Sequence, residues 1–317
     1  MPQTISEKII AQAANRDTVS PGEIVTCVVD LAMIHDSGGP RRVKPILDKL
    51  KVGVWDASKI VLISDHYAPC VDAESAAILK LTREWAEEHG IKNFYDQQGI
   101  CHVVTPERGH LHPGMFAVGG DSHSPTGGAF GAYMFGIGAT DMAGVLATGK
   151  TWIRVPHTIS INWTGAMGVG VAAKDMALKM CAVLGMDGGD YQAIQYTGKA
   201  VKSLDMMERM TLCNMAAELG AQTGIIEPDE VTTHYLVEAG VVPGEWQIFE
   251  SDAEAEYLRV HEFNGDTLEP QVAAPNSPSN TSNVSDADKV DIDQFYIGAC
   301  TGAKLSDLKM VASVLKG

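Results

Sequence analysis

The sequence lacks closely spaced cysteines. Its cysteines form no C-x-x-C pair; they are Cys27, Cys70, Cys101, Cys181, Cys213 and Cys300. The N-terminus also lacks the basic segment and apolar core of a secretory signal, so a disulfide framework is not expected. Each cysteine should be a small buried side chain unless its neighbours indicate otherwise. Because no apolar run is long enough to cross a bilayer, we expect a cytoplasmic protein with no membrane partner.

Positive charge is also scarce. Lys and Arg number 24 against 40 Asp and Glu, which gives a formal net charge of −16. A field of that sign repels nucleic acid, which we therefore exclude as a partner. It also repels a polycarboxylate substrate, so a site for such a substrate needs local cations. The 45% of apolar residues is ample for packed cores, and 317 residues predict two or three domains.

Three short apolar runs each end in polar side chains. They are residues 59–64, before Asp65 and His66; residues 115–118, before Asp121, Ser122 and His123; and residues 294–297, before Cys300. Such runs are typical of strands buried on both faces of a parallel sheet, whose carboxyl ends hold ligand sites. Helices are expected over residues 72–89, 173–184 and 204–219. The predicted fold class is α/β, with mainly parallel sheets.

The domain organisation follows from changes of composition. A new strand begins near residue 155, so residues 1–154 are expected to form a first domain. Residues 155–288 form a second, which ends in a polar linker, residues 273–287, rich in Pro, Ser and Asn. Residues 289–317 begin a third domain and are too few for an independent core.

Two groups of polar residues are candidates for catalysis. Asp65 can orient His66 and keep it protonated, although such a pair is more often structural. Asp121, Ser122 and His123 lie among glycines that let backbone approach a ligand. Their spacing matches neither a dinucleotide fingerprint nor a phosphate loop, which argues against a nucleotide site.

The remaining candidates are weaker. Asn214 and Glu218 share a face of the third expected helix, where a water-facing polar stripe is the commoner explanation. A zinc site was considered at His102, His110 and His112, but the spacing matches no standard zinc motif. Cys300 could be a nucleophile, a metal ligand or a buried thiol.

These motifs together resemble the aconitase family, above all the large subunits of 3-isopropylmalate dehydratases. The resemblance rests on segments that follow one another in the same order as in the family. They are residues 120–131, 135–141, 173–178, 208–221 and 296–301. It implies a hydro-lyase whose [4Fe–4S] cluster, held by three cysteines, acts as a Lewis acid. A 2-hydroxy acid would become its 3-hydroxy isomer through an alkene.

The resemblance also implies roles for particular residues. His66 would be the proton donor and Asp65 its orienting carboxylate. His102 matches a second active-site histidine, and Asp121 and His123 match a second Asp–His pair. Ser122, Asn214 and Glu218 match polar residues around the cluster, with Glu218 bonded to the iron-bound water. Cys300 matches the first cluster ligand.

The sequence departs from the family pattern in three places. The family's C-x-x-C pair is missing, so the other two ligands are expected beyond Gly317, and the chain as given should not hold the cluster. At the first cluster cysteine, the family's C-T-N-G-R or C-T-N-S is replaced by Cys300-Thr-Gly-Ala-Lys. Near the N-terminus, the family's H-E-V-T-S-P is replaced by His35-Asp-Ser-Gly-Gly-Pro. These changes make other small 2-hydroxy diacids or triacids as plausible as isopropylmalate.

A partner is expected as well. In the family, a swivelling domain supplies a serine base and substrate-binding arginines, and in two-subunit enzymes it is a separate small subunit. Two other functions stay open: a non-catalytic remnant of the fold that binds a partner, and a zinc enzyme. Metal analysis separates the three, because they predict iron with sulfide, no metal, or zinc.

Overall fold

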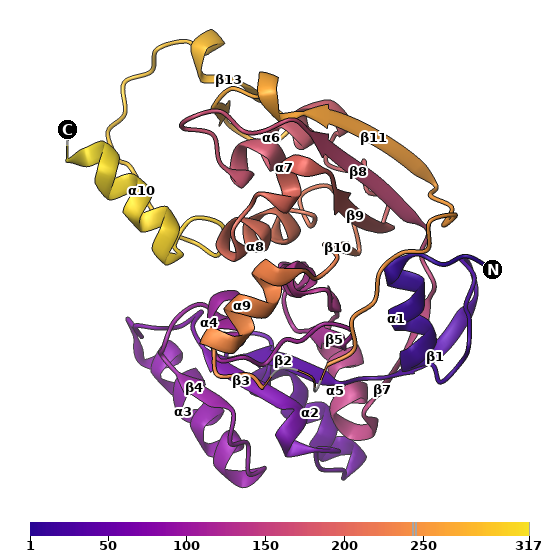
Figure 1. Ribbon diagram of the computed structural model, residues 1–317. Coiled ribbons are helices and arrows are strands. Elements are labelled where there is room, and N and C mark those ends of the chain that lie inside the picture. Colours follow the sequence, from indigo (N-terminus) through magenta and orange to yellow (C-terminus); the bar gives the residue numbers. More distant parts are fainter. Residues whose placement is uncertain (243, 245, 317) are drawn as a thin grey trace.

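The larger sheet of this chain is parallel and has five strands. The computed structural model describes residues 1–242, 244 and 246–316 (Figure 1). The strand order is β4-β3-β2-β5-β6: β2 (Leu31–His35), β3 (Ile60–Ser64), β4 (Phe94–Asp96), β5 (Phe116–Gly119) and β6 (Tyr133–Gly136). Strands β2, β3 and β5 are buried along their whole length. Burial on both faces explains why two of the three predicted apolar runs are strands here.

Helices cover one face of this sheet. They are α1 (Ile5–Ala13), α2 (Pro40–Leu50), α3 (Ala73–Glu88) and α5 (Ala139–Thr148). Helix α3 matches its expected bounds, because the Asp72 side chain accepts a hydrogen bond from the Ser75 N–H at 2.8 Å and caps its start. Ile78 and Trp85 of this helix are buried, and Trp85 packs in the core cluster formed with the sheet. Helix α4 (Cys101–Glu107) packs on the other face, which turns toward the second half of the chain.

The second half contains a four-stranded parallel sheet of order β10-β9-β8-β11. Its strands are β8 (Thr158–Thr164), β9 (Ala193–Thr197), β10 (Thr223–Ile225) and β11 (Arg259–Asn264). Its helices are α6 (Ala173–Leu184), α7 (Lys199–Lys202), α8 (Met206–Asn214) and α9 (Glu230–Glu238). A 3₁₀ segment, η2 (Ser124–Phe130), packs between the two sheets, and a Cβ on its Gly128 would collide with the carbonyl oxygen of Gly224. Both halves confirm the α/β class.

Smaller elements complete the chain. Antiparallel pairs join β1 (Ile24–Val28) to β7 (Lys150–Arg154) and β12 (Gln271–Ala273) to β13 (Thr281–Asn283); the remaining elements are η1 (Ala57–Lys59), η3 (Gly265–Thr267), η4 (Val284–Asp286) and α10 (Leu305–Leu315). The domain boundary predicted at residue 155 falls between β7 and β8 and stays a prediction. Among the described residues, no helix has the length and apolarity needed to cross a membrane.

Three expectations about local structure were wrong. Residues 294–297 are not a strand, and Phe295 and Tyr296 are 73% and 79% exposed, because no described strand lies beside them to complete a ladder. The expected linker at residues 273–287 contains half of the β12–β13 hairpin. The helix expected over residues 204–219 ends at Asn214, and consecutive turns follow to Gly220.

An ion pair between a buried arginine and a partly exposed aspartate holds α8 against the start of α9. Arg209 is fully buried, and its guanidinium donates to both Asp229 carboxylate oxygens at 2.7 Å and to the carbonyls of Lys202 and Leu204. Asp229 also caps α9. Part of the motif at residues 208–221 therefore stabilises the fold.

Arg209→Leu is expected to lower the free energy of unfolding by about 3 kcal/mol, because Asp229 loses its partner and two carbonyls lose donors. Urea unfolding measures the change. Arg259→Leu is the control, because Arg259 lies 4.0 Å from Asp190 at the surface; its loss should stay below about 1 kcal/mol. Equal losses in the two variants would contradict this account.

Candidate functional site

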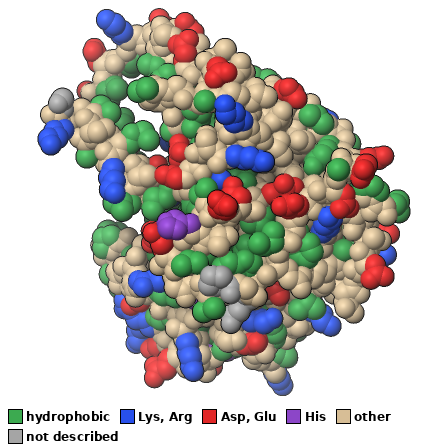
Figure 2. Space-filling view, viewed as in Figure 1, with side chains coloured by type: hydrophobic (Ala, Val, Ile, Leu, Met, Phe, Trp, Pro, Cys, Tyr) green, Lys and Arg blue, Asp and Glu red, His purple; other side chains and the backbone are tan. Residues whose placement is uncertain are grey.

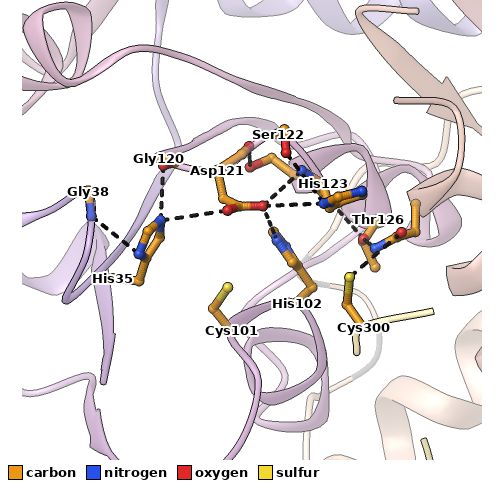
Figure 3. A network of polar contacts seen from close by, with 12 residues as sticks. His35, Gly38, Cys101, His102, Gly120, Asp121, Ser122, His123, Thr126 and Cys300 are labelled. Carbon is orange, nitrogen blue, oxygen red and sulfur yellow. Dashed lines mark hydrogen bonds and ion pairs between the residues drawn. The ribbon is translucent and has the colours of Figure 1, made fainter. Parts of the chain in front are cut away.

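The carboxyl ends of three neighbouring strands bring polar side chains together, and Figure 3 shows those around Asp121. Strand β3 leads to Asp65 and His66, and β5 leads to Asp121. Strand β2 lies between them and leads to His35 and Asp36. Parallel strands align these ends, so residues far apart in sequence meet at one edge of the sheet.

Asp121 is the centre of the cluster. Its Oδ1 accepts a hydrogen bond from His102 Nε2 at 2.7 Å and from the His123 N–H at 2.9 Å. Its Oδ2 lies 3.6 Å from His66 Nε2 and 3.8 Å from His35 Nε2. Burial alone would raise the pKa of Asp121, but contacts with His102, His123 and His66 outweigh it and hold the pKa far below its ordinary value. Asp121 is therefore an anion on which four imidazoles converge.

His66 is held between two carboxylates. Its Nε2 faces Asp121, and its Nδ1 lies 2.7 Å from Asp65 Oδ1. Contacts with the carboxylates of Asp121 and then Asp65 raise the pKa of His66 to about 10, although burial opposes the shift. Asp65 is fixed in turn, because its Oδ2 accepts the Cys101 N–H at 2.6 Å where α4 begins. The side chain of His66 is still 38% exposed, so its proton can reach a ligand.

Sequence reasoning missed His35 and Asp36 as members of the site. The His35 ring stacks on His66 at 4.0 Å, and burial followed by repulsion from His66 lowers its pKa. The Asp36 carboxylate is fully buried and accepts the N–H groups of Ser37, His66 and Tyr67 at 3.0–3.1 Å. The sequence did carry the pattern, because a buried apolar strand precedes His35 and Asp36 as one precedes Asp65 and His66.

A second group extends the site toward the other half of the chain. His123 Nε2 lies 3.0 Å from Glu218 Oε1, and contacts with Asp121 and Glu218 raise the pKa of His123 to about 10. Ser122 Oγ lies 3.4 Å from His123 Nδ1. Glu218 reaches His123 from the turns after α8, so it does not share a regular helix face with Asn214.

Asn214 links η2 to Cys300. It is fully buried, which contradicts the water-facing stripe suggested by its spacing. Its Nδ2 donates to Thr126 Oγ1 at 2.8 Å, and Cys300 Sγ lies 3.8 Å from its Oδ1. Cys300 is half-buried, and its side chain lies near His123 and Thr126 (Figure 3).

The donor set was tested against the two metal hypotheses. In the part of the chain described here, the candidate metal-binding groups are His35, Asp36, Asp65 and His66, and His102, Asp121 and His123; neither includes a cysteine. A four-iron cluster needs three thiolates, so these groups do not fit it as a set. His110 and His112 bond to the Tyr95 hydroxyl and the Gly109 carbonyl and join neither group, which argues against the zinc hypothesis.

We predict that the His66 imidazolium stays protonated through neutral pH. Its folded pKa is raised from 6.5 to about 10, so its stabilising contribution is complete below pH 6.5 and is lost as the pH rises toward 10. The His66 Cε1–H signal in an NMR titration measures this, with His66→Asn for assignment. Asp65→Asn should lower the pKa, because one carboxylate is removed. A titration at the ordinary value of 6.5 would contradict the geometry.

Comparison with known proteins gives a consistent result. Residues 7–317 match the aconitase family (aconitate hydratase). The chain is 45% identical to 3-isopropylmalate dehydratase large subunit 1 of Methanopyrus kandleri, over all of this chain and 75% of that protein. It is 43% identical to the probable methanogen homoaconitase large subunit of Methanothermobacter thermautotrophicus, over 98% of this chain and 73% of that protein. The 3-isopropylmalate dehydratase large subunit of Aquifex aeolicus is 40% identical over all of this chain and 73% of its own length.

Proposed function

Because this chain belongs to the aconitase family and is an enzyme of the hydro-lyase type, we propose that it is the large subunit of a dehydratase for a small 2-hydroxy di- or tricarboxylic acid. The observation that carries the proposal is the convergence of His66, His102 and His123 on Asp121, with Glu218 and Cys300 on the facing side. Dehydration needs a proton for the departing hydroxide, because hydroxide is a poor leaving group.

His66 has the properties of the proton donor. The Asp65 and Asp121 carboxylates keep it charged at neutral pH, and its ring is partly exposed in the cleft. Asp65 fixes the orientation of the ring through Nδ1, which leaves Nε2 to face Asp121 and a ligand. The cationic His123 supplies a second positive group for a substrate carboxylate.

The names of the relatives limit the class of substrate. Large subunits named for 3-isopropylmalate dehydratase and for homoaconitase are nearly equally similar to this chain, at 45% and 43% identity. We therefore propose the class of 2-hydroxy diacids and triacids. With a net charge of −16, the chain needs added cations to hold such an anion, and we propose that a small swivel-type subunit supplies them together with the base. A cytoplasmic location stays a prediction.

The cluster is proposed on chemical grounds. A [4Fe–4S] cluster would supply Lewis-acid chemistry to a bound hydroxy acid. The Cys300 thiol lies beside Asn214 and near His123. We propose it as one sulfur ligand of the cluster. We propose that the other two thiolates are not Cys27, Cys101, Cys181 or Cys213, because these thiols are buried and burial raises the pKa of each.

The test uses the natural gene product that contains this chain, reconstituted anaerobically with iron and sulfide and mixed with the small subunit. The mixture should dehydrate a 2-hydroxy acid, seen as alkene absorbance, and the large subunit alone should not. Cys300→Ala should lose the visible iron–sulfur absorption, while Cys70→Ala, which alters an exposed thiol, keeps it. Turnover by the large subunit alone would overturn the partner proposal, and an unchanged spectrum in Cys300→Ala would overturn the ligand proposal. A stable assembly with neither iron nor turnover would favour the non-catalytic alternative.

A further inference from the structure

The segment that carries Cys300 has one buried residue, and it is a lysine. From residue 288 to 316, Lys304 is 1% exposed and every other described residue is exposed or half-buried. Figure 2 shows this part of the chain projecting from the body of the molecule, with apolar side chains on its surface. Apolar burial therefore contributes little to fixing the position of Cys300.

Lys304 makes polar contacts in two directions. Its ammonium donates to Thr211 Oγ1 on α8 at 2.7 Å and lies 2.8 Å from Asp307 Oδ2 on α10. The Thr301 carbonyl, next to Cys300, lies 3.4 Å away. A buried ammonium is costly unless hydrogen bonds and an opposite charge satisfy it, so loss of either partner should loosen the segment.

The contact with Thr211 leads directly to the site. Thr211 lies one turn before Asn214 on α8, and Asn214 Oδ1 is 3.8 Å from Cys300 Sγ. Lys304 and Asn214 thus attach the turn after Cys300, and Cys300 itself, to the same helix, and Thr211 Oγ1 also donates to the Thr301 carbonyl at 3.4 Å. Asn214 also donates to Thr126, so α8 is fixed to η2 near His123.

The backbone beside Cys300 needs such an anchor. Ala299 has a φ of 65°, in the left-handed region that residues with a Cβ rarely adopt. A strained residue keeps its conformation only when its surroundings impose it. No strand forms at residues 294–297 to do so, which leaves the contacts after Cys300.

We propose that Lys304 is a positioning residue that holds the Cys300 thiol against Asn214 by tying the turn to Thr211. The value of that position to catalysis rests on the proposed function, in which Cys300 is a sulfur ligand. The geometric claim concerns the thiol of this chain alone. It can therefore be tested without cluster, partner or substrate.

The experiment measures the rate at which iodoacetamide alkylates Cys300 in the 317-residue chain at one pH, by peptide mass spectrometry. Lys304→Met keeps the length of the side chain and removes its donors, and should accelerate alkylation about tenfold or more, because the turn opens locally. Thr211→Val should have a similar effect. Asp307→Asn should have a smaller one, because the link to α8 remains. Lys304→Arg keeps a cation and should preserve the slow rate.

Two controls separate positioning from general stability. The alkylation rate of the exposed Cys70 and the thermal midpoint should be unchanged in Thr211→Val. The rates of the double variant and of Lys304→Met should differ little, because both substitutions remove the Lys304–Thr211 contact and the double variant loses in addition only the longer bond from Thr211 to the Thr301 carbonyl. An unchanged Cys300 rate in Lys304→Met overturns the proposal. So does a large effect of Asp307→Asn with none of Thr211→Val, which would show that Lys304 only stabilises α10. Absence of hydro-lyase turnover would overturn the proposed function and leave this result intact.

Discussion

Asp121→Asn is expected to lower kcat of the assembled enzyme by about 10⁴, the scale seen when an amide replaces the carboxylate that orients a catalytic histidine. Asp121 contacts His66, His102 and His123 at once, so the substitution removes the negative charge that organises all three. An amide also presents N–H groups where Nε2 of His102 needs an acceptor. One substitution therefore disturbs proton donation and substrate binding together.

The matched control is Asp48→Asn, a 60% exposed carboxylate near the end of α2 that pairs only with Lys44 in the contacts described. It should leave kcat within about twofold, because an exposed surface ion pair contributes little. Circular dichroism and the iron–sulfur spectrum check that Asp121→Asn is still folded and loaded. A kcat within tenfold of the wild type in that variant would show that the histidines do not act through Asp121.

Much of the site could be predicted from local sequence, because the position of a strand determines where its last residues lie. The apolar runs at β3 and β5 placed Asp65, His66 and Asp121 directly after strands, which is where they lie in the structure. The same rule applies to β2 and would have found His35 and Asp36. The role of Asp36 could not be predicted from any local pattern. Its carboxylate accepts hydrogen bonds from the backbone N–H groups of His66 and Tyr67, about 30 residues away in sequence.

The errors also have physical causes. A strand exists only beside another strand, so the apolar composition of residues 294–297 was insufficient to predict one. Helix α8 was expected to reach residue 219, since its last residues favour helix and Gly220 can end one. It stops at Asn214 instead, and the following turns direct Glu218 to His123, 95 residues away in sequence. Both errors arise where long-range contacts override local preference.

His66→Asn is expected to lower kcat of the assembled enzyme by about 10²–10⁴, the usual loss when a general acid is removed. Asparagine can still bond to Asp65 but cannot deliver a proton, so KM should change much less than kcat. Asp65→Asn should cost less, because the imidazole remains and Asp121 still faces its Nε2. The iron–sulfur spectrum should be unchanged in both variants, since neither residue is near Cys300 in the contacts described.

The pH dependence separates His66 from its neighbours. In the wild type, kcat should fall as the pH rises toward 10, where His66 loses its proton. In Asp65→Asn that fall should move to lower pH, because one of the two carboxylates that raise the pKa is gone. In His66→Asn the residual kcat should no longer fall as the pH rises toward 10, because the group that titrates there has been removed. Near-normal turnover in His66→Asn would instead assign the proton donor to His102 or His123, two further imidazoles that contact Asp121.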